Sequence, residues 1–162
     1  MQEWSTPLVL ATGAFLAVLL WRVRPAWPWS SKRAALRVTL RDARARVEAA
    51  KDPLARAQAL CDAADITARG GGRYGSAAGL YQRALRADPQ SAEIVSRAVA
   101  GLAKRPRALE SLLWRALAAT PWTGDSRDAA RVALEALRAL HEGPLKNPVR
   151  ARALANARDA IS

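Results

Sequence analysis

The chain has one cysteine, Cys61, and one histidine, His141. A single cysteine cannot form a disulfide within the chain. The two residues together supply too few ligands for a zinc site of the usual four-ligand kind, and neither H-E-x-x-H nor G-x-S-x-G occurs. Cys61 is predicted to be a small buried residue, and His141 to be a cation that stabilises a helix end. We therefore expect no enzyme activity, no catalytic residue, no metal site and no cofactor.

Strand patterns are also missing from the sequence. No segment alternates apolar and polar residues as a half-buried strand does. Hydrophobic residues make up 51% of the chain but aromatic residues only 6%, and much of the apolar content is alanine and leucine, which are good helix formers. Glycine and proline, nine of each, gather between the Ala/Leu/Arg-rich runs. The sequence therefore predicts an all-α protein.

Acidic residues are few: 14 against 26 lysines and arginines, which gives a net charge of +12. Such a charge favours an anionic binding partner, such as phospholipid headgroups, nucleic acid or an acidic protein. Residues 22–50 contain eight basic and two acidic residues, and their net charge of +6 is half of the net charge of the chain. Nucleic acid is the least favoured partner, because few aromatic residues outside the N-terminal region are available to stack on bases.

A charge-free run, WSTPLVLATGAFLAVLLW, covers residues 4–21. As a helix it would be about 27 Å long, close to the hydrocarbon thickness of a bilayer. A cleaved signal peptide would begin with basic residues and end in small ones, which this segment does not; a buried core helix is the other alternative. We expect a single transmembrane anchor over residues 1–24. Its predicted membrane-contacting side chains are Trp4, Leu8, Leu10, Phe15, Leu19 and Trp21.

A basic segment over residues 25–52 follows the predicted span. Because lysine and arginine favour the cytoplasmic side, we expect the N-terminus outside and the C-terminal domain in the cytoplasm, at a bacterial inner membrane. The residues predicted to meet lipid headgroups are Arg22, Arg24, Trp27, Trp29, Lys32, Arg33 and Arg37. A helix over 32–51, with its apolar stripe at Leu36, Leu40, Ala43, Val47 and Ala50, either lies on anionic lipid or packs as the first helix of the domain.

Residues 53–162 are predicted to form a helical domain. Asp52-Pro53 and Ser91 have the residue types that begin helices. The predicted helices cover 53–69 and 76–87, then three segments that start after Ser91, Pro106 and the sequence PWTGDS, and a last segment from about 149 to 161. The stripe of the first is Leu54, Ala57, Cys61, Ala64 and Ala68, and that of the last is Ala153, Leu154, Ala157 and Ile161.

The glycines Gly70, Gly72 and Gly75 fit the spacing G-x-G-x-x-G. A phosphate-binding loop of this type follows a β-strand and needs an acidic residue about 20 positions later. The residues before it, LCDAADITAR, are typical of a helix instead. The glycines therefore predict a turn between two helices.

The residues after this turn carry a family resemblance. The matching residues are Gly72, Tyr74, Ala77, Tyr81, Ala84 and Pro89. This segment resembles the turn and second helix of a tetratricopeptide repeat, a 34-residue helix–turn–helix unit. The first helix matches less well, with small residues at three of the large positions and Asp65 where glycine is usual. A degenerate second unit ends at Pro121, so the resemblance covers residues 55–121.

The resemblance implies protein–protein binding. Repeats of this family hold a peptide or helix against their first helices, which here maps to Asp62, Ile66, Arg69, Glu93, Ser96, Arg97 and Ala100. The arginines among them favour an acidic peptide as a hypothesis. The expected function is a membrane-anchored scaffold or adaptor for a protein partner. The alternative is a small structural subunit of a membrane complex.

Overall fold

The computed structural model describes residues 15, 29–70 and 74–161, and divides the chain into two compact units, 1–35 and 36–162. Of the predicted membrane-contacting side chains only Phe15 lies within the described residues; it is helical and 65% exposed. None of the helices within the described ranges combines the length and the apolar character that a membrane crossing requires. The predicted anchor itself, residues 4–21, otherwise lies outside the described part of the chain.

All regular structure within the described residues is helical, which confirms the all-α prediction. The elements are α2 (Trp29–Ala49), α3 (Pro53–Arg69), α4 (Tyr74–Ala87), α5 (Ala92–Leu102), α6 (Pro106–Ala119), a 3₁₀ turn η1 (Gly124–Ser126), α7 (Arg127–Glu142) and α8 (Pro148–Ala160). The boundaries agree with the sequence-based ones within about three residues, as capping and proline signals allow.

Side-chain caps mark the starts of α3 and α5. The Asp52 carboxylate accepts a hydrogen bond from the backbone N–H of Ala55 at 2.9 Å, and the Ser91 hydroxyl accepts one from that of Ile94 at 3.3 Å. Each cap satisfies a donor that the first turn of a helix leaves without a partner. Both residues therefore begin helices as their positions in the sequence predict.

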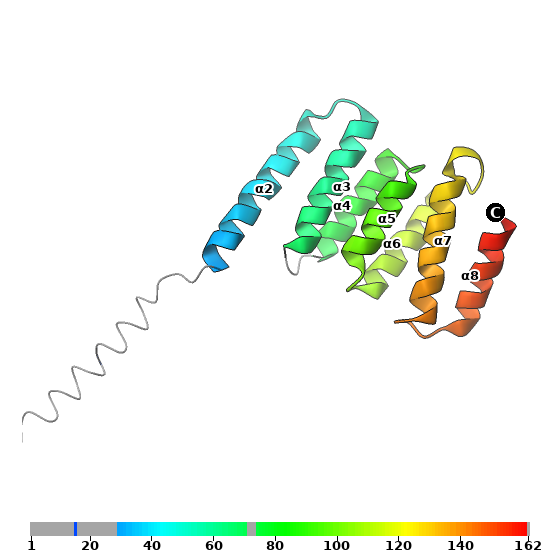
Figure 1. Cartoon of the computed structure of the whole chain (residues 1–162). Helices are drawn as coiled ribbons and strands as arrows, with labels where there is room; N and C mark the ends of the chain where they lie inside the picture. Colours follow the sequence, from blue (N-terminus) through cyan, green and yellow to red (C-terminus); the bar gives the residue numbers. More distant parts are fainter. Residues whose placement is uncertain (1–14, 16–28, 71–73, 162) are drawn as a thin grey trace, which may run out of the picture. The chain divides into compact units, whose positions relative to one another are not determined.

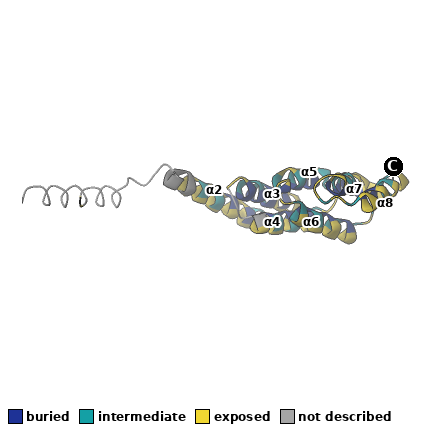
Figure 2. Ribbon diagram, turned by 90° about the horizontal axis from the view of Figure 1, so that it is seen from below, coloured by how far each residue is buried: buried dark blue, intermediate teal, exposed yellow. Residues whose placement is uncertain are grey.

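The second unit consists of two layers of helices. We call α3, α5 and α7 the front layer and α4 and α6 the back layer; within each layer, consecutive members pack side by side (Figure 1). The buried faces of the helices meet between the layers (Figure 2). α8 packs against α7 at the end of the array, and α2 from Leu36 onward precedes α3. Helices therefore alternate in direction along the chain, and every turn lies at one of two ends.

Small residues line the contact between α3 and α4. Ala57, Cys61 and Ala64 of α3 and Ala77 and Ala84 of α4 are fully buried. Alanine on both sides allows two helix backbones to approach closely, and larger side chains fill the remaining space from neighbouring helices. The weak hydrophobicity of these segments is therefore compatible with a dense core.

Two predicted core positions are wrong. Leu54 is 57% exposed, because it lies in the first turn of α3, where no neighbouring helix covers it. Ala153 is exposed as well, since α8 presents Ala151 and Leu154 to the core instead. Both errors concern the ends of the predicted stripes, where periodicity continues but the neighbouring element does not.

The helix α2 packs through the stripe that the sequence indicates. Ala43 and Val47 are buried, whereas Leu36, Leu40 and Ala50 are partly buried. This favours the second of the two interpretations of this segment, a first helix of the domain with its charged side chains in solvent.

Candidate protein-binding surface

The predicted groove residues belong to α3 and α5, two helices of the front layer. Arg97 is the centre of an ion-pair cluster: its Nε and Nη2 donate to Asp65 Oδ2 at 3.0 and 2.7 Å, and Nη2 donates to Asp62 Oδ1 at 2.6 Å. Hydrogen bonding to Asp62 raises the pKa of Arg97 above its ordinary value. Arg97 is therefore occupied by carboxylates of its own chain.

Other charges join the same cluster more loosely. Arg46 of α2 lies 3.6 Å from Asp62, Arg69 lies 3.7 Å from Asp65, and Glu93 lies 4.0 Å from Arg97. Arg69 and Glu93 have side chains 80% and 78% exposed, so solvent screens these contacts. We call these residues, with Asp62, Asp65 and Arg97, the α3–α5 cluster.

Tyr81 connects this cluster to the core. Its side chain is fully buried, and its hydroxyl donates a hydrogen bond to Asp65 Oδ1. Burial, followed by this hydrogen bond, raises the pKa of Tyr81 above its ordinary value. Gly101 leaves room on α5 for the hydroxyl, because a Cβ at that position would collide with it. Tyr81 of the back layer thus reaches between two helices of the front layer.

Asp65 is a central residue of the α3–α5 cluster that the predicted groove did not include. Asp65 accepts two of the three hydrogen bonds that Arg97 donates, and it also accepts the hydrogen bond from the Tyr81 hydroxyl. The available signal was its departure from the repeat pattern, a carboxylate where glycine is usual. A charged residue in a tightly packed helix needs partners, and Asp65 has hydrogen-bond donors 16 and 32 residues further along the chain, Tyr81 and Arg97.

A second ion-pair cluster lies on α7 and α8. Glu135 accepts hydrogen bonds from Arg138 Nη2 and from Arg158 Nη1, each at 2.7 Å, and Arg138 Nη1 also donates to Glu142 at 3.2 Å. Hydrogen bonds from Arg138 and then Arg158 hold the pKa of Glu135 below its ordinary value. We call these four residues the α7–α8 cluster; they tie the last helix to the front layer.

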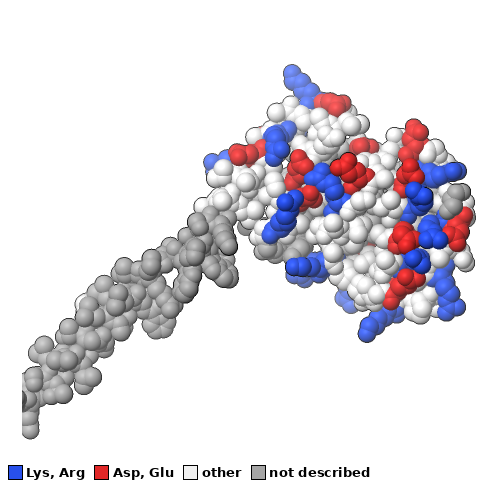
Figure 3. All heavy atoms as spheres, in the orientation of Figure 1, with Lys and Arg blue, Asp and Glu red and all other residues white. Residues whose placement is uncertain are grey.

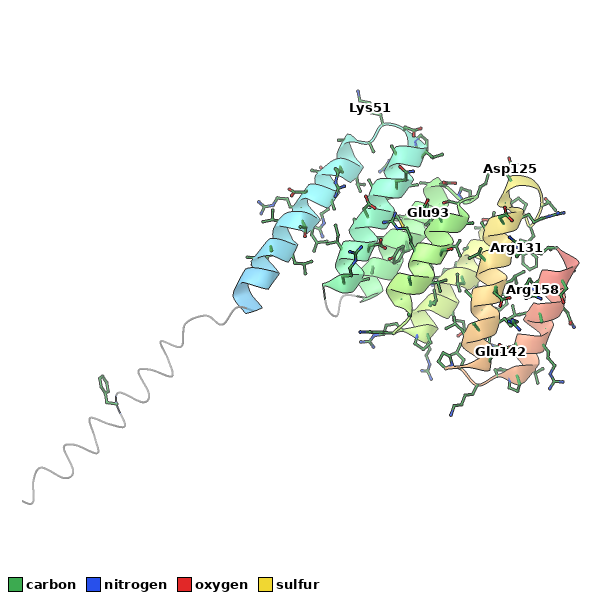
Figure 4. All side chains as sticks on the ribbon, viewed as in Figure 1. Lys51, Glu93, Asp125, Arg131, Glu142 and Arg158 are labelled. Carbon is green, nitrogen blue, oxygen red and sulfur yellow. The ribbon has the colours of Figure 1, made fainter. Side chains whose placement is uncertain are left out.

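An open groove of about 720 Å³ lies on the front layer beside the second cluster. Its apolar floor comes from α5 and α7, with Val99, Val132 and Ala136 partly buried. The remaining lining residues are Ser96, Arg131, Glu135, Ala139 and Arg158. Figure 3 shows two areas of intermixed charge on this face, separated by a strip with few charges. In Figure 4, Arg131 and Arg158 lie on α7 and α8, the two helices on one side of this strip.

The predicted groove residues divide between two hollows. Ser96 lines the apolar groove, whereas Arg69, Arg97 and Ala100 line a more polar hollow of about 590 Å³ between α3 and α5. Ile66 is partly buried, and its carbonyl accepts the N–H of Gly70 at 3.0 Å. The predicted groove residues therefore line two separate hollows rather than one, and their role in binding a partner stays a prediction.

The residues that match the repeat pattern differ in burial, and two of them are not fully described by the structure. Ala77, Tyr81 and Ala84 are fully buried, and Pro89 is exposed after the end of α4. Gly72 lies outside the described residues, and for Tyr74 only its place at the start of α4 is described. The described residues before the glycines form helix α3 and not a strand, which agrees with the turn interpretation.

His141 lies in the last turn of α7, as predicted, but it is buried, with a side chain only 2% exposed. Its Nε2 lies 3.3 Å from Glu110 Oε1 of α6. Asn147 donates its backbone N–H to the His141 carbonyl at 2.7 Å, which satisfies one of the acceptors at the helix end. The residue therefore joins α6, α7 and the following turn.

Most predicted headgroup residues lie outside what the structure describes. Arg22, Arg24 and Trp27 fall outside the described ranges, and Trp29, Lys32 and Arg33 belong to α2 without described side chains. Arg37 is described and exposed.

Comparisons of the chain with protein-family models, with curated proteins and with solved structures found no match.

Proposed function

We propose that this chain is a membrane-anchored, tetratricopeptide-like scaffold that binds a protein partner through the apolar groove of its front layer. The observation that carries the proposal is an apolar floor formed by Val99, Val132 and Ala136, which are only partly buried and lie beside charges that pair within the chain. Apolar surface in a groove with a polar rim is typical of a protein-binding site.

The occupant that fits best is an amphipathic helix from a partner protein. The groove runs between α5 and α7 and has small and β-branched residues on its floor, so a helix can lay an apolar stripe along it. The ion pairs beside it, such as Glu135 with Arg158 at 2.7 Å, neutralise one another. Apolar contact rather than charge would then supply most of the affinity.

The membrane part of the proposal comes from the sequence alone. The charge-free run at 4–21 would hold the chain in a bilayer, with the basic residues after it on the cytoplasmic side. Protease added outside intact cells should leave the C-terminal domain undigested. Its digestion from outside would contradict the topology.

The groove is tested with Ala136→Arg in the full chain. Arginine on the floor would fill the groove and present a charge to an apolar stripe, so the partner should bind at least tenfold more weakly while the melting temperature stays unchanged. Ala118→Arg places the same side chain on an exposed position of α6 in the back layer and is the matched control. Partners are identified by a photoreactive residue at position 132. Equal binding by both variants would remove the groove from the proposal.

The alternative, a structural subunit of a membrane complex, predicts different behaviour of the isolated domain. Residues 36–162 form a compact unit, and an adaptor should keep this unit soluble and folded without partners. A subunit buried in an assembly should instead aggregate when it is expressed alone. Size-exclusion chromatography and thermal unfolding of this fragment distinguish the two.

A further inference from the structure

The second unit has two chemically different ends. At one end lie the connections α3–α4, α5–α6 and α7–α8, and at the other lie α2–α3, α4–α5 and α6–α7 (Figure 1). The labels Lys51 and Asp125 mark one end in Figure 4, and Glu142 marks the other. The chain enters this unit at the Glu142 end, because a Cβ on Gly70 would meet the Leu36 side chain of α2.

Charge is distributed unevenly between these ends. Each end consists of the described residues of its connections, the adjoining helical turns, and the turn at which the chain enters or leaves the unit. The end where the chain enters has seven basic residues and one acidic residue, Glu142. The seven, which we call the basic end, are Arg37, Arg69, Lys104, Arg105, Arg107, Lys146 and Arg150. The opposite end has six basic and seven acidic residues.

Much of the charge at the basic end is available to a partner. Among the described residues, no ion pair is formed by Arg37, Lys104, Arg107 or Lys146, and all four are exposed. Arg150 has a side chain 62% exposed and lies 3.6 Å from Glu110. By contrast, the arginines on the front layer, such as Arg97 and Arg138, are held by carboxylates.

We propose that the basic end rests on an anionic bilayer surface, so that the helices stand on the membrane and the groove stays open to the side. This inference rests on the proposed function, because the predicted anchor reaches the unit at this same end. The basic residues come from α2 and from three separate turns, so they form a broad surface suited to many headgroups. Lysine and arginine are attracted to such a surface over a range of about 10 Å at moderate salt, so the attraction should weaken as salt is added.

The test uses the full chain with Cys61→Ser, reconstituted into phosphatidylcholine vesicles with or without phosphatidylglycerol. A fluorophore is attached to Ala103→Cys at the basic end or, as control, to Thr123→Cys at the opposite end; both sites are exposed. Lipids with a spin-labelled headgroup quench a fluorophore near the surface. We expect quenching at position 103 to be severalfold stronger in anionic than in neutral vesicles and to be lost at high salt. Position 123 should stay unquenched.

Charge reversal supplies the second arm. Lys104→Glu with Lys146→Glu should remove most of the quenching at position 103, whereas Lys51→Glu with Arg127→Glu at the other end should leave it unchanged. Flotation with vesicles of either composition tests the anchor separately. A chain that floats but shows no lipid-dependent quenching at position 103 overturns the inference and leaves the anchor intact. Quenching at both positions, or a fluorescence change at position 103 with an oligonucleotide and not with vesicles, overturns it as well.

Discussion

Gly101 has no side chain, and this leaves the space on α5 that the Tyr81 hydroxyl occupies. The Tyr81 hydroxyl occupies the space that a Cβ on Gly101 would need, and its ring is fully buried. Because the ring is enclosed and its hydroxyl is hydrogen-bonded to Asp65, the tyrosine has little freedom to move aside. Glycine at this position therefore serves packing rather than a turn.

Gly101→Ala should destabilise the domain by about 1–3 kcal/mol, because the new methyl group overpacks a filled site. The matched control is Gly79→Ala, in the exposed part of α4, where a Cβ would meet nothing within 4 Å. That change should stabilise the domain by about 0.5–1 kcal/mol, since alanine is the better helix former. Urea unfolding of both variants gives the two values. Equal effects of the same sign would contradict the packing around Tyr81.

Cys61 is fully buried, and burial raises its thiol pKa from 9.0 to about 11. Between these two pKa values, the Cys61 thiol therefore keeps its proton in the folded state and loses it in the unfolded state. The corresponding stabilisation is complete below pH 9 and is lost as the pH rises toward about 11. The difference in melting temperature between the parent and Cys61→Ala should narrow across this range. Tyr81 is present in both proteins, so its own titration cancels in this difference in melting temperature. A difference that stayed constant over this pH range would contradict the burial of the thiol.

At the scale of the elements, an ion-pair cluster joins two helices of the front layer, α3 and α5. Arg97 joins α5 to two carboxylates of α3, and Asp65 also receives the Tyr81 hydroxyl of α4. When one side chain of a partly buried ion pair is removed, the other keeps its desolvation cost but has no partner. This loss of stability is larger than the net stabilisation that the ion pair contributes. The α3–α5 cluster therefore fixes the spacing of three helices.

Arg97→Met should cost about 2 kcal/mol, because it leaves Asp62 and Asp65 without their hydrogen-bond donor. The matched control is Arg131→Met on α7, whose side chain is 57% exposed and lies 3.4 Å from Asp128 of the same helix. An exposed pair of this kind contributes at most about 0.5 kcal/mol. Thermal and urea unfolding report both changes. Similar costs for the two arginines would show that the α3–α5 cluster is only a surface feature.

At the largest scale, each described helix of the second unit packs mainly against the next one or two helices along the chain. α8 packs on α7, burying Ala151 and Leu154, and contributes Arg158 to the α7–α8 cluster. In such arrays stability is roughly a sum of local terms, and a terminal element can open without the rest. We therefore expect a gradient of stability toward the C-terminal end.

Leu154→Ala should lower the stability of α8 by about 2 kcal/mol through loss of buried apolar contact. Val149→Ala, at a position 72% exposed in the same helix, should change it by less than about 0.5 kcal/mol. Hydrogen exchange should show faster exchange in α8 of the first variant, with α3 and α4 unaffected. Uniformly faster exchange in all helices would mean that the array unfolds as one unit.

The sequence by itself determined the helices. Periodicity, the caps at Asp52 and Ser91 and the prolines between segments are local signals, and hydrogen bonds within a helix are local as well. The burial of Ala77, Tyr81 and Ala84 follows from the same spacing. The exposure of Leu54 and Ala153 could not be predicted from this spacing, because the burial of an apolar stripe depends on where the neighbouring helix ends.

Only the tertiary structure decided which charges are available. In the sequence, Arg97 and Lys104 are two basic residues of one segment; in the fold, Arg97 is held by Asp62 and Asp65, whereas Lys104 is exposed at the basic end. Pairing between residues 32 and 35 positions apart depends on how the helices pack. The apolar groove has the same origin, since its floor joins α5 to α7. Local signals fix each helix, and the contacts between helices determine which surfaces remain for a partner.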